Sequence, residues 1–222
     1  MKAFFFVVDE YLADVASAQA LNLIQLTGCD VHIFVERRDK RAIVSELLTV
    51  ASLKYHYDVL GDLLPPNLPS SQKWPPIVYL RVFAPFFLQE YDRVLYLDAD
   101  VHCRHFDERI WSVELPNGLA AVHDLVIAVS VPLGLTIGKR EWLDSIGVSD
   151  TRYFNSGVLL IDVRKWCEVD FARKLVDYFE TYGNKVYMFD QDFLNYDPYK
   201  NDQNFTFSPT FDGLPIDLSW HT

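Results

Sequence analysis

Apolar residues occur in short continuous runs along this chain, and segments with helical spacing of apolar positions lie between the runs. The run over residues 3–8 predicts a strand buried on both faces of a parallel sheet, because such strands are apolar at nearly every position. Further runs predict strands over residues 31–35, 94–97 and 157–162. The alternation of these strands with helices favours a doubly wound α/β sheet.

Apolar positions that recur every three or four residues predict the helices. The segments with this spacing are 12–28, 77–88 and 164–182, and a polar helix is predicted over residues 39–51. Gly28 is expected to end the helix over 12–28, and Pro85 is expected to bend the one over 77–88. Residues 61–76 contain five prolines and predict a loop. Because no repeat or change in composition marks a second domain, we expect a single domain over residues 1–222.

The balance of charge excludes one class of partner and favours a cofactor. The chain has 31 acidic and 20 basic residues, a formal net charge of −11. Proteins that bind nucleic acid present basic surfaces that displace counterions, so we expect no nucleic-acid partner. An acidic protein also repels a phosphorylated substrate, and a bound divalent cation would offset that repulsion locally.

The cysteine content and the first apolar run bear on the compartment. The three cysteines, at positions 29, 103 and 167, lack metal-site spacing and indicate reduced thiols rather than a disulfide framework. The apolar run over residues 3–8 is too short for a secretory signal or a membrane span, and no other stretch approaches that length. We expect a cytoplasmic protein with no integral membrane segment, and peripheral contact with the inner membrane stays open.

Two acidic residues follow the strand predicted over residues 94–97. Asp98 and Asp100 would lie at the carboxyl end of that strand, where ligands bind in α/β sheets. Residues two apart in an extended segment point to the same side. The two carboxylates could therefore converge on Mn²⁺ or Mg²⁺, which take oxygen ligands. The alternative is that both acids are solvated turn residues, and an isolated Asp-x-Asp does not decide between the two.

Two later segments combine polar groups that suit a polyhydroxylated ligand. Asn155, Ser156 and Gly157 offer an amide, a hydroxyl and an unobstructed backbone just before a buried strand, and a simple turn is the alternative. Residues 190–192 place several polar side chains near the start of a short helix. The alternative there is that Asp190 only caps the helix.

Taken in order, these segments resemble glycosyltransferase family 8, in particular its bacterial lipopolysaccharide galactosyl- and glucosyltransferases. The resemblance covers nearly the whole chain and implies the GT-A fold, an open, mostly parallel Rossmann-like sheet with helices on both faces. The matching segments are Asp9-Glu-Tyr11, Tyr79-Leu-Arg81, Tyr96-Leu-Asp-Ala-Asp100, Phe154-Asn-Ser-Gly-Val-Leu-Leu-Ile-Asp162 and Asp190-Gln-Asp-Phe-Leu-Asn195.

The resemblance implies a metal and a nucleoside site. Asp98 and Asp100 would bind Mn²⁺, with Mg²⁺ as the alternative, and through the metal the donor diphosphate. Asp9 and Tyr11 would contact the nucleoside. The metal would act as a Lewis acid on the leaving group and as a template.

The same resemblance implies residues around the donor sugar. The donor-binding positions would include Arg81, Asp124, Asn155, Ser156 and Gly157. Asp190 and Gln191 would be the catalytic pair, with Gln191 beneath the anomeric carbon. Because an amide is a poor nucleophile, a same-face displacement assisted by the leaving diphosphate is the simpler mechanism.

The chain departs from the family pattern in two places. Val8 and Glu10 stand where the family commonly has another acid or amide for the base, so uracil recognition is implied less firmly. The family's C-terminal His-x-x-Gly-x-x-Lys-Pro-Trp segment is not found before the end at Ser219-Trp-His-Thr222. His221 is a candidate third metal ligand, with a surface residue as the alternative. We therefore expect weak metal affinity and slow turnover.

The implied function is transfer of galactose or glucose from a UDP-sugar to a saccharide or glycolipid acceptor, with retention of configuration and with Mn²⁺. A catalytically weak or inactive relative that binds nucleotide sugars is the first alternative. A metal-dependent nucleotidyltransferase is the second, but such enzymes usually carry a Gly-rich, basic phosphate loop, and the sequence contains none.

Overall fold

The structure is a computed structural model of the 222-residue chain. It describes residues 1–37, 50–71, 75–124, 139–148, 153–196 and 217–220, the last four by their backbone. The helix predicted over residues 39–51 lies almost entirely outside the described residues.

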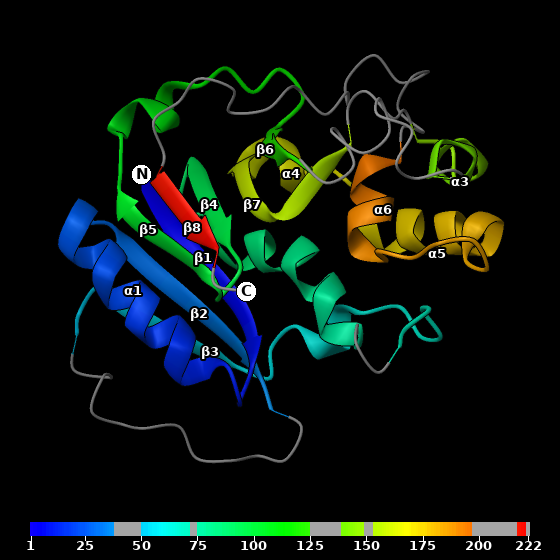
Figure 1. The fold of residues 1–222 in the computed structure, drawn as a ribbon. Coiled ribbons are helices and arrows are strands. Elements are labelled where there is room, and N and C mark those ends of the chain that lie inside the picture. Colours follow the sequence, from blue (N-terminus) through cyan, green and yellow to red (C-terminus); the bar gives the residue numbers. More distant parts are fainter. Residues whose placement is uncertain (38–49, 72–74, 125–138, 149–152, 197–216, 221–222) are drawn as a thin grey trace.

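A six-stranded sheet forms the centre of the molecule, in the order β3-β2-β1-β4-β7-β6 (Figure 1). Its strands are β1 Lys2–Asp9, β2 Asp30–Glu36, β3 Leu53–Tyr57, β4 Arg93–Leu97, β6 Leu119–His123 and β7 Phe154–Asp162. Strands β1, β2, β3 and β4 run parallel to one another, and β7 runs antiparallel to both β4 and β6. The prediction of an open, mostly parallel sheet is confirmed.

Both faces of the sheet are covered, which explains the apolar character of β1. Phe5 belongs to a hydrophobic core with Tyr96, whereas Phe4 and Phe6 belong to a second core on the opposite face. Successive residues of a strand point to opposite faces, so a strand that is covered on both faces of the sheet needs apolar residues at consecutive positions.

One face carries a helix and a two-stranded ribbon. Helix α1, Ala13–Thr27, packs there beside β5, Val101–His105, which pairs with β8, Asp217–Trp220 (Figure 1). The helix ends where the sequence predicts. Gly28 takes a φ of 68°, and its N–H donates to the carbonyl of Ile24 at 2.8 Å.

The other face is covered by short helices. They are the 3₁₀ helices η3 Pro76–Val82 and η4 Ala84–Phe87 and the α-helices α4 Val163–Cys167, α5 Phe171–Tyr182 and α6 Asp190–Asn195. The remaining short elements are η2 Gly61–Leu63, η5 Glu108–Ser112 and α3 Lys139–Ser145.

Two helix predictions are corrected in this layer. The single long helix predicted over residues 164–182 is wrong, because α5 has its own start, where the carboxylate of Asp170 accepts from the N–H of Arg173 at 3.1 Å. The helical stretch over residues 77–88 is two 3₁₀ helices that meet at Phe83. Proline has no N–H for an interior helical bond, and Pro85 sits in the first turn of η4, where none is required.

Two findings bear on the compartment predictions. Within the described ranges, no helix combines the length and apolar character that crossing a membrane would require. All three cysteines are free thiols.

A buried histidine on β2, His32, contacts a partly buried histidine on the edge strand β3. His32 on β2 is 1% exposed, and its Nδ1 lies 2.9 Å from Nε2 of His56 on β3. Its Nε2 lies 3.0 Å from the hydroxyl of Tyr91, which donates to Asp30 at 2.6 Å. Burial lowers the pKa of His32 to about 3, and the charges on His56 and Lys54 act in the same direction.

This pair predicts a pH-dependent stability. An unfolded chain protonates His32 near its ordinary pKa of 6.5, whereas the folded chain does so only near pH 3. The contribution of His32 to the free energy of unfolding is therefore complete above pH 7 and decreases as the pH falls through 6.5 toward 3. Between pH 7 and pH 5 we expect the free energy of unfolding to decrease by about 2 kcal/mol through this residue.

Urea unfolding of wild type and of His32→Phe at pH 7 and pH 5 gives the free energy of unfolding at each pH. The contribution of His32 is the difference between the two proteins in how steeply that free energy changes with pH, called the slope below. The comparison with wild type is needed because burial raises the pKa of Asp190 to about 6, which acts in the opposite direction. His105→Gln, on the exposed part of β5, is the control and should keep the wild-type slope. Equal slopes for His32→Phe and wild type would contradict the prediction.

Candidate active site

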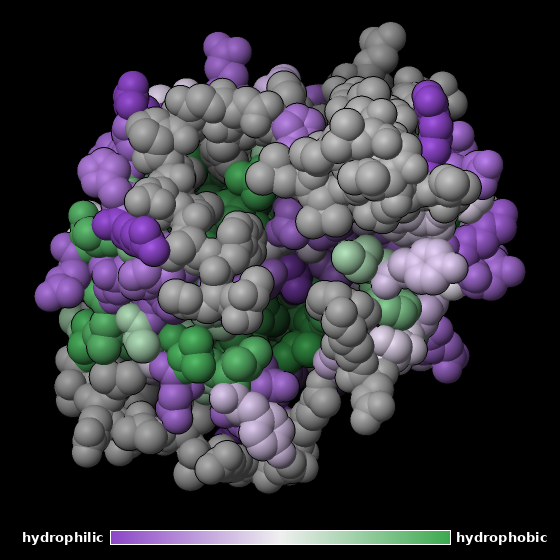
Figure 2. All heavy atoms as spheres, in the orientation of Figure 1, coloured by the Kyte–Doolittle hydropathy of each residue, from purple (hydrophilic) through white to green (hydrophobic). Residues whose placement is uncertain are grey.

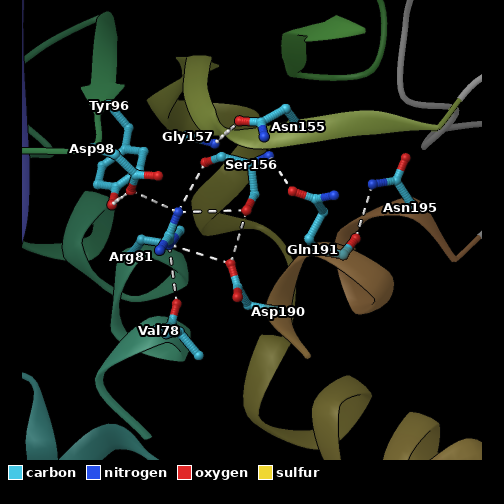
Figure 3. Close-up of polar contacts among 10 residues, drawn as sticks. All are labelled: Val78, Arg81, Tyr96, Asp98, Asn155, Ser156, Gly157, Asp190, Gln191 and Asn195. Carbon is cyan, nitrogen blue, oxygen red and sulfur yellow. Dashed lines mark hydrogen bonds and ion pairs between the residues drawn. The ribbon is translucent and has the colours of Figure 1, made fainter. Parts of the chain in front are cut away.

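A polar cluster lies where the carboxyl end of β4 meets the start of β7 and helix α6 (Figure 3). Because β7 runs antiparallel to β4, its first residues lie at the same edge of the sheet as the last residues of β4. Ligands of α/β sheets collect at this edge. Figure 2 shows hydrophilic residues in a hollow near the middle of this face of the molecule.

Arg81 on η3 connects the parts of the cluster. Its Nη1 donates to Oδ1 of Asp98 and to the carbonyl of Ser156, both at 3.0 Å. Its Nε lies 3.3 Å from Oδ2 of Asp190, and its guanidinium stacks over the ring of Tyr96 at 4.8 Å. Burial acts to lower the pKa of Arg81, but the carboxylates of Asp190 and Asp98 outweigh it and raise the pKa above its ordinary value. Arg81 is thus a buried cation between two acids.

Asp190 is the more buried of those two acids, at 4% exposed. It is the first residue of α6, and its carboxylate accepts from the hydroxyl of Ser156 at 3.1 Å. Burial raises the pKa of Asp190 to about 6 although Arg81 acts against it. The N-cap position of α6 is Phe189, so the alternative that Asp190 only caps the helix is excluded.

Asp98 is held through one of its two oxygens. Oδ1 accepts from Arg81 and from the hydroxyl of Tyr96, the latter at 2.5 Å. Oδ2 lies next to Gly157, where an added Cβ would come within 2.6 Å of it. The carboxylate of Asp98 can therefore occupy this position only because residue 157 has no side chain. The backbone N–H of Asp98 also donates to the carbonyl of Gly157 at 2.8 Å.

Asp100 lies on the turn that follows. The turn is closed by the N–H of Val101, which donates to the carbonyl of Asp98 at 3.0 Å, and Asp100 itself is exposed. Partial desolvation and the charge on Asp98 raise the pKa of Asp100. Within the described ranges, no group of three or more His, Cys, Asp or Glu side chains is placed to hold a metal. Trp220 of β8 pairs with Val101, and His221 lies outside the described residues.

The side-chain amide of Gln191 bridges β7 to the end of β6. Its Oε1 accepts from the N–H of Ser156 at 3.1 Å, and its Nε2 donates to Oδ2 of Asp124 at 3.0 Å. Asn155 and Ser156 lie within β7, not before it as predicted, because that strand begins at Phe154. The Oδ1 of Asn155 accepts from the N–H of Gly157 at 2.8 Å.

The predicted nucleoside residues lie at the end of β1, the strand beside β4. Oδ1 of Asp9 accepts from the N–H groups of Tyr11 and Leu12, at 3.1 and 3.2 Å, and so shapes the turn into α1. Tyr11 is 55% exposed. These two residues share the edge of the sheet with the Arg81 cluster.

The structure adds residues to which the sequence gave no role. Tyr96 supports both Asp98 and Arg81. Asn195 binds the backbone of Phe154 in both directions, at 2.7 and 2.8 Å, and donates to the carbonyl of Gln191 at 2.9 Å. Helical spacing could have pointed to Asn195, which lies four residues after Gln191 on the same side of α6.

The sequence matches known proteins over most of its length. The profile of Glycosyl transferase family 8 matches residues 18–206. A lipopolysaccharide 1,2-glucosyltransferase of Escherichia coli is 30% identical over 74% of this chain and 48% of its own length. A lipopolysaccharide 1,3-galactosyltransferase of Salmonella typhimurium is 29% identical over 58% of this chain and 38% of its own length. The chain thus spans about half the length, or less, of these relatives.

Solved structures of glycosyltransferases share the fold. The galactosyltransferase LgtC, in complex with donor and acceptor sugar analogs, superposes with a TM-score of 0.67 at 21% identity, over all of this chain and 87% of that one. The glycosyltransferase GlyE of Streptococcus pneumoniae superposes with a TM-score of 0.57 at 22% identity, over 96% of this chain and 46% of that one. This chain belongs to glycosyltransferase family 8 and has the GT-A fold.

Proposed function

We propose that the protein transfers galactose or glucose from a UDP-sugar to a saccharide acceptor with retention of configuration. The observation that carries this proposal is the buried Arg81, which ties Asp98 at the end of β4 to Asp190 at the start of α6. The candidate diphosphate ligand and the candidate catalytic residues therefore belong to one site, in a chain of family 8.

The proposed cofactor is Mn²⁺, with Mg²⁺ as the alternative. With Oδ1 of Asp98 taken by Arg81 and Tyr96, the second oxygen beside Gly157 and the exposed carboxylate of Asp100 are the donors for a hard cation. The ion would offset the repulsion between a diphosphate and an acidic chain and act as a Lewis acid on the leaving group. We propose His221 as a further ligand, because β8 runs beside the strand that follows Asp100.

The chain's own residues would bind and orient the donor sugar. Arg81, Asp190 and Asn155 offer charged and polar groups to sugar hydroxyls. The Gln191 amide is fixed between Ser156 and Asp124, which suits a polar group that supports the developing positive charge at the anomeric carbon. An amide is a poor nucleophile, so we propose that the acceptor attacks from the same face as the leaving diphosphate.

The Escherichia coli and Salmonella typhimurium relatives are lipopolysaccharide glycosyltransferases by name, and we propose a lipopolysaccharide saccharide as the acceptor class here. Thermal unfolding with a panel of nucleotide sugars, with and without Mn²⁺, identifies the donor, because a bound ligand stabilises the folded state. Transfer to truncated lipopolysaccharide is then followed by NMR, which gives the anomeric configuration of the product. Stabilisation by a UDP-hexose without turnover would identify a binding protein, and stabilisation by no nucleotide sugar would overturn the proposal.

A further inference from the structure

Asp192 is a fully buried acid beside the candidate catalytic residues, but its hydrogen-bond partners differ from those of Asp190 and Gln191. It is 0% exposed, and its Oδ1 accepts from the hydroxyl of Tyr153 at 2.6 Å. Its Oδ2 accepts from the backbone N–H groups of Tyr187 and Met188, at 2.8 and 2.9 Å. These three donors are neutral. Burying a carboxylate is unfavourable unless hydrogen bonds satisfy it, and the three donors satisfy Asp192. We therefore expect the role of Asp192 to lie in the backbone that it holds.

The backbone that Asp192 holds is strained. Phe189 has a φ of 42° and a ψ of −101°, a conformation that a residue with a side chain rarely adopts. Asp190 and Gln191 follow directly, and the N–H of Gln191 donates to the carbonyl of Met188 at 2.8 Å. The turn at Phe189 therefore sets the direction in which Asp190 and Gln191 leave the backbone.

Both residues reach β7 because of that direction. Asp190 contacts Arg81 and the hydroxyl of Ser156, and the amide of Gln191 accepts from the N–H of Ser156. Without the carboxylate of Asp192, the amides of Tyr187 and Met188 would lose their acceptors, and Phe189 could relax to an ordinary φ. Such a change would turn Asp190 and Gln191 away from Ser156.

We propose that Asp192 is a positioning residue, which together with Tyr153 holds the strained turn at Phe189 and so aims Asp190 and Gln191 into the site. A direct chemical role is disfavoured, since Asp192 would have to break three hydrogen bonds to reach a ligand. The inference rests on the proposed function for its kinetic test, but its structural test does not.

The test separates the charge of Asp192 from its hydrogen bonds. In Asp192→Asn, Oδ1 can accept from both backbone amides while Nδ2 donates to the oxygen of Tyr153, so the turn is kept. Asp192→Ala removes all three bonds. We expect kcat to fall about 10²-fold in Asp192→Ala, the size of effect that a displacement of about 1 Å produces, with KM for the donor changed less. Asp192→Asn should stay within about tenfold of wild type.

Amide hydrogen exchange supplies a readout that needs no activity. Asp192→Ala should lose protection over residues 186–193 and keep it in β1 and α5, whereas Asp192→Asn should keep it throughout. Asp162→Ala is the matched control, because it also removes a carboxylate that binds a backbone N–H, that of Lys165 in α4, outside the site. It should keep wild-type activity.

Three outcomes would overturn the positioning role. If Asp192→Asn were as inactive as Asp192→Ala, the negative charge of Asp192 rather than its hydrogen bonds would be required for activity. A fully active Asp192→Ala would show that the turn does not depend on it. Unchanged exchange over residues 186–193 in Asp192→Ala would show the same without any assay of transfer. Absence of transfer by the wild-type protein would instead refute the proposed function, and the exchange comparison would still decide the role of Asp192.

Discussion

Replacement of Arg81 with methionine is expected to lower the free energy of unfolding by about 3–5 kcal/mol, the cost of removing one partner of a buried ion pair. Methionine fills similar space but leaves the carboxylates of Asp98 and Asp190 without their cation. For a chain of this length, the melting temperature should fall by roughly 10 °C. Chemical denaturation and calorimetry measure both quantities.

Arg93→Met is the matched control for this prediction. The Nη1 of Arg93 donates to the backbone carbonyls of Trp111 and Val113, so its removal leaves neutral acceptors rather than unpaired charges. We expect it to cost clearly less stability. Adding Asp190→Asn to Arg81→Met should recover part of the loss, because one unpaired charge is removed. Equal losses for Arg81→Met and Arg93→Met would show that the ion pairs contribute little.

Replacement of Asp98 or Asp100 with alanine is expected to abolish Mn²⁺-dependent donor binding. Transfer should fall by about 10²–10³-fold, as when an electrostatic stabiliser of the leaving group is lost. Asp100→Ala is the cleaner variant, because Asp98 also accepts from Arg81 and Tyr96 and its loss disturbs the protein itself. Calorimetric titration of Mn²⁺ and of the donor measures the two affinities separately.

Gly157→Ala extends this prediction without removing a carboxylate. A methyl group there would lie 2.6 Å from Oδ2 of Asp98, so that carboxylate has to move. Donor affinity in the presence of Mn²⁺ should fall while the circular dichroism spectrum is kept. Asp107→Asn, at the N-cap of η5 and away from the site, is the control that should bind donor normally. Wild-type donor binding by Asp98→Ala and by Asp100→Ala would disprove the metal site at these two residues.

Strands β1, β2, β4 and β7 were predicted from the sequence because their burial is a local property, whereas β3, β5, β6 and β8 were not predicted. A strand covered on both faces needs apolar residues at consecutive positions, and residues 3–8 and 94–97 meet this condition. The position of Asp98 after such a strand is local as well. That these acids lie at the ligand-binding edge could therefore be predicted, as could the end of α1 at Gly28.

Other features depend on contacts between distant segments, and local pattern does not contain them. Helical spacing of apolar residues over 164–182 continues across the break between α4 and α5. The position of that break depends on the cap at Asp170 and on the packing of each helix. Arg81 stands among apolar residues, and only the folded chain brings Asp98 and Asp190 to it from elements 17 and 109 residues further along. The role of Asp192 depends in the same way on Tyr153 and on a strained Phe189.

The sequence by itself thus determined four strands of the sheet and the edge at which polar residues gather, because burial acts over a few neighbouring residues. Only the tertiary structure decided which charges are paired and how Gln191 is held. A buried charge is stable only with a partner at hydrogen-bond distance, and that partner can come from anywhere in the chain. For Asp190 the partner is Arg81, and for the amide of Gln191 it is Ser156 and Asp124.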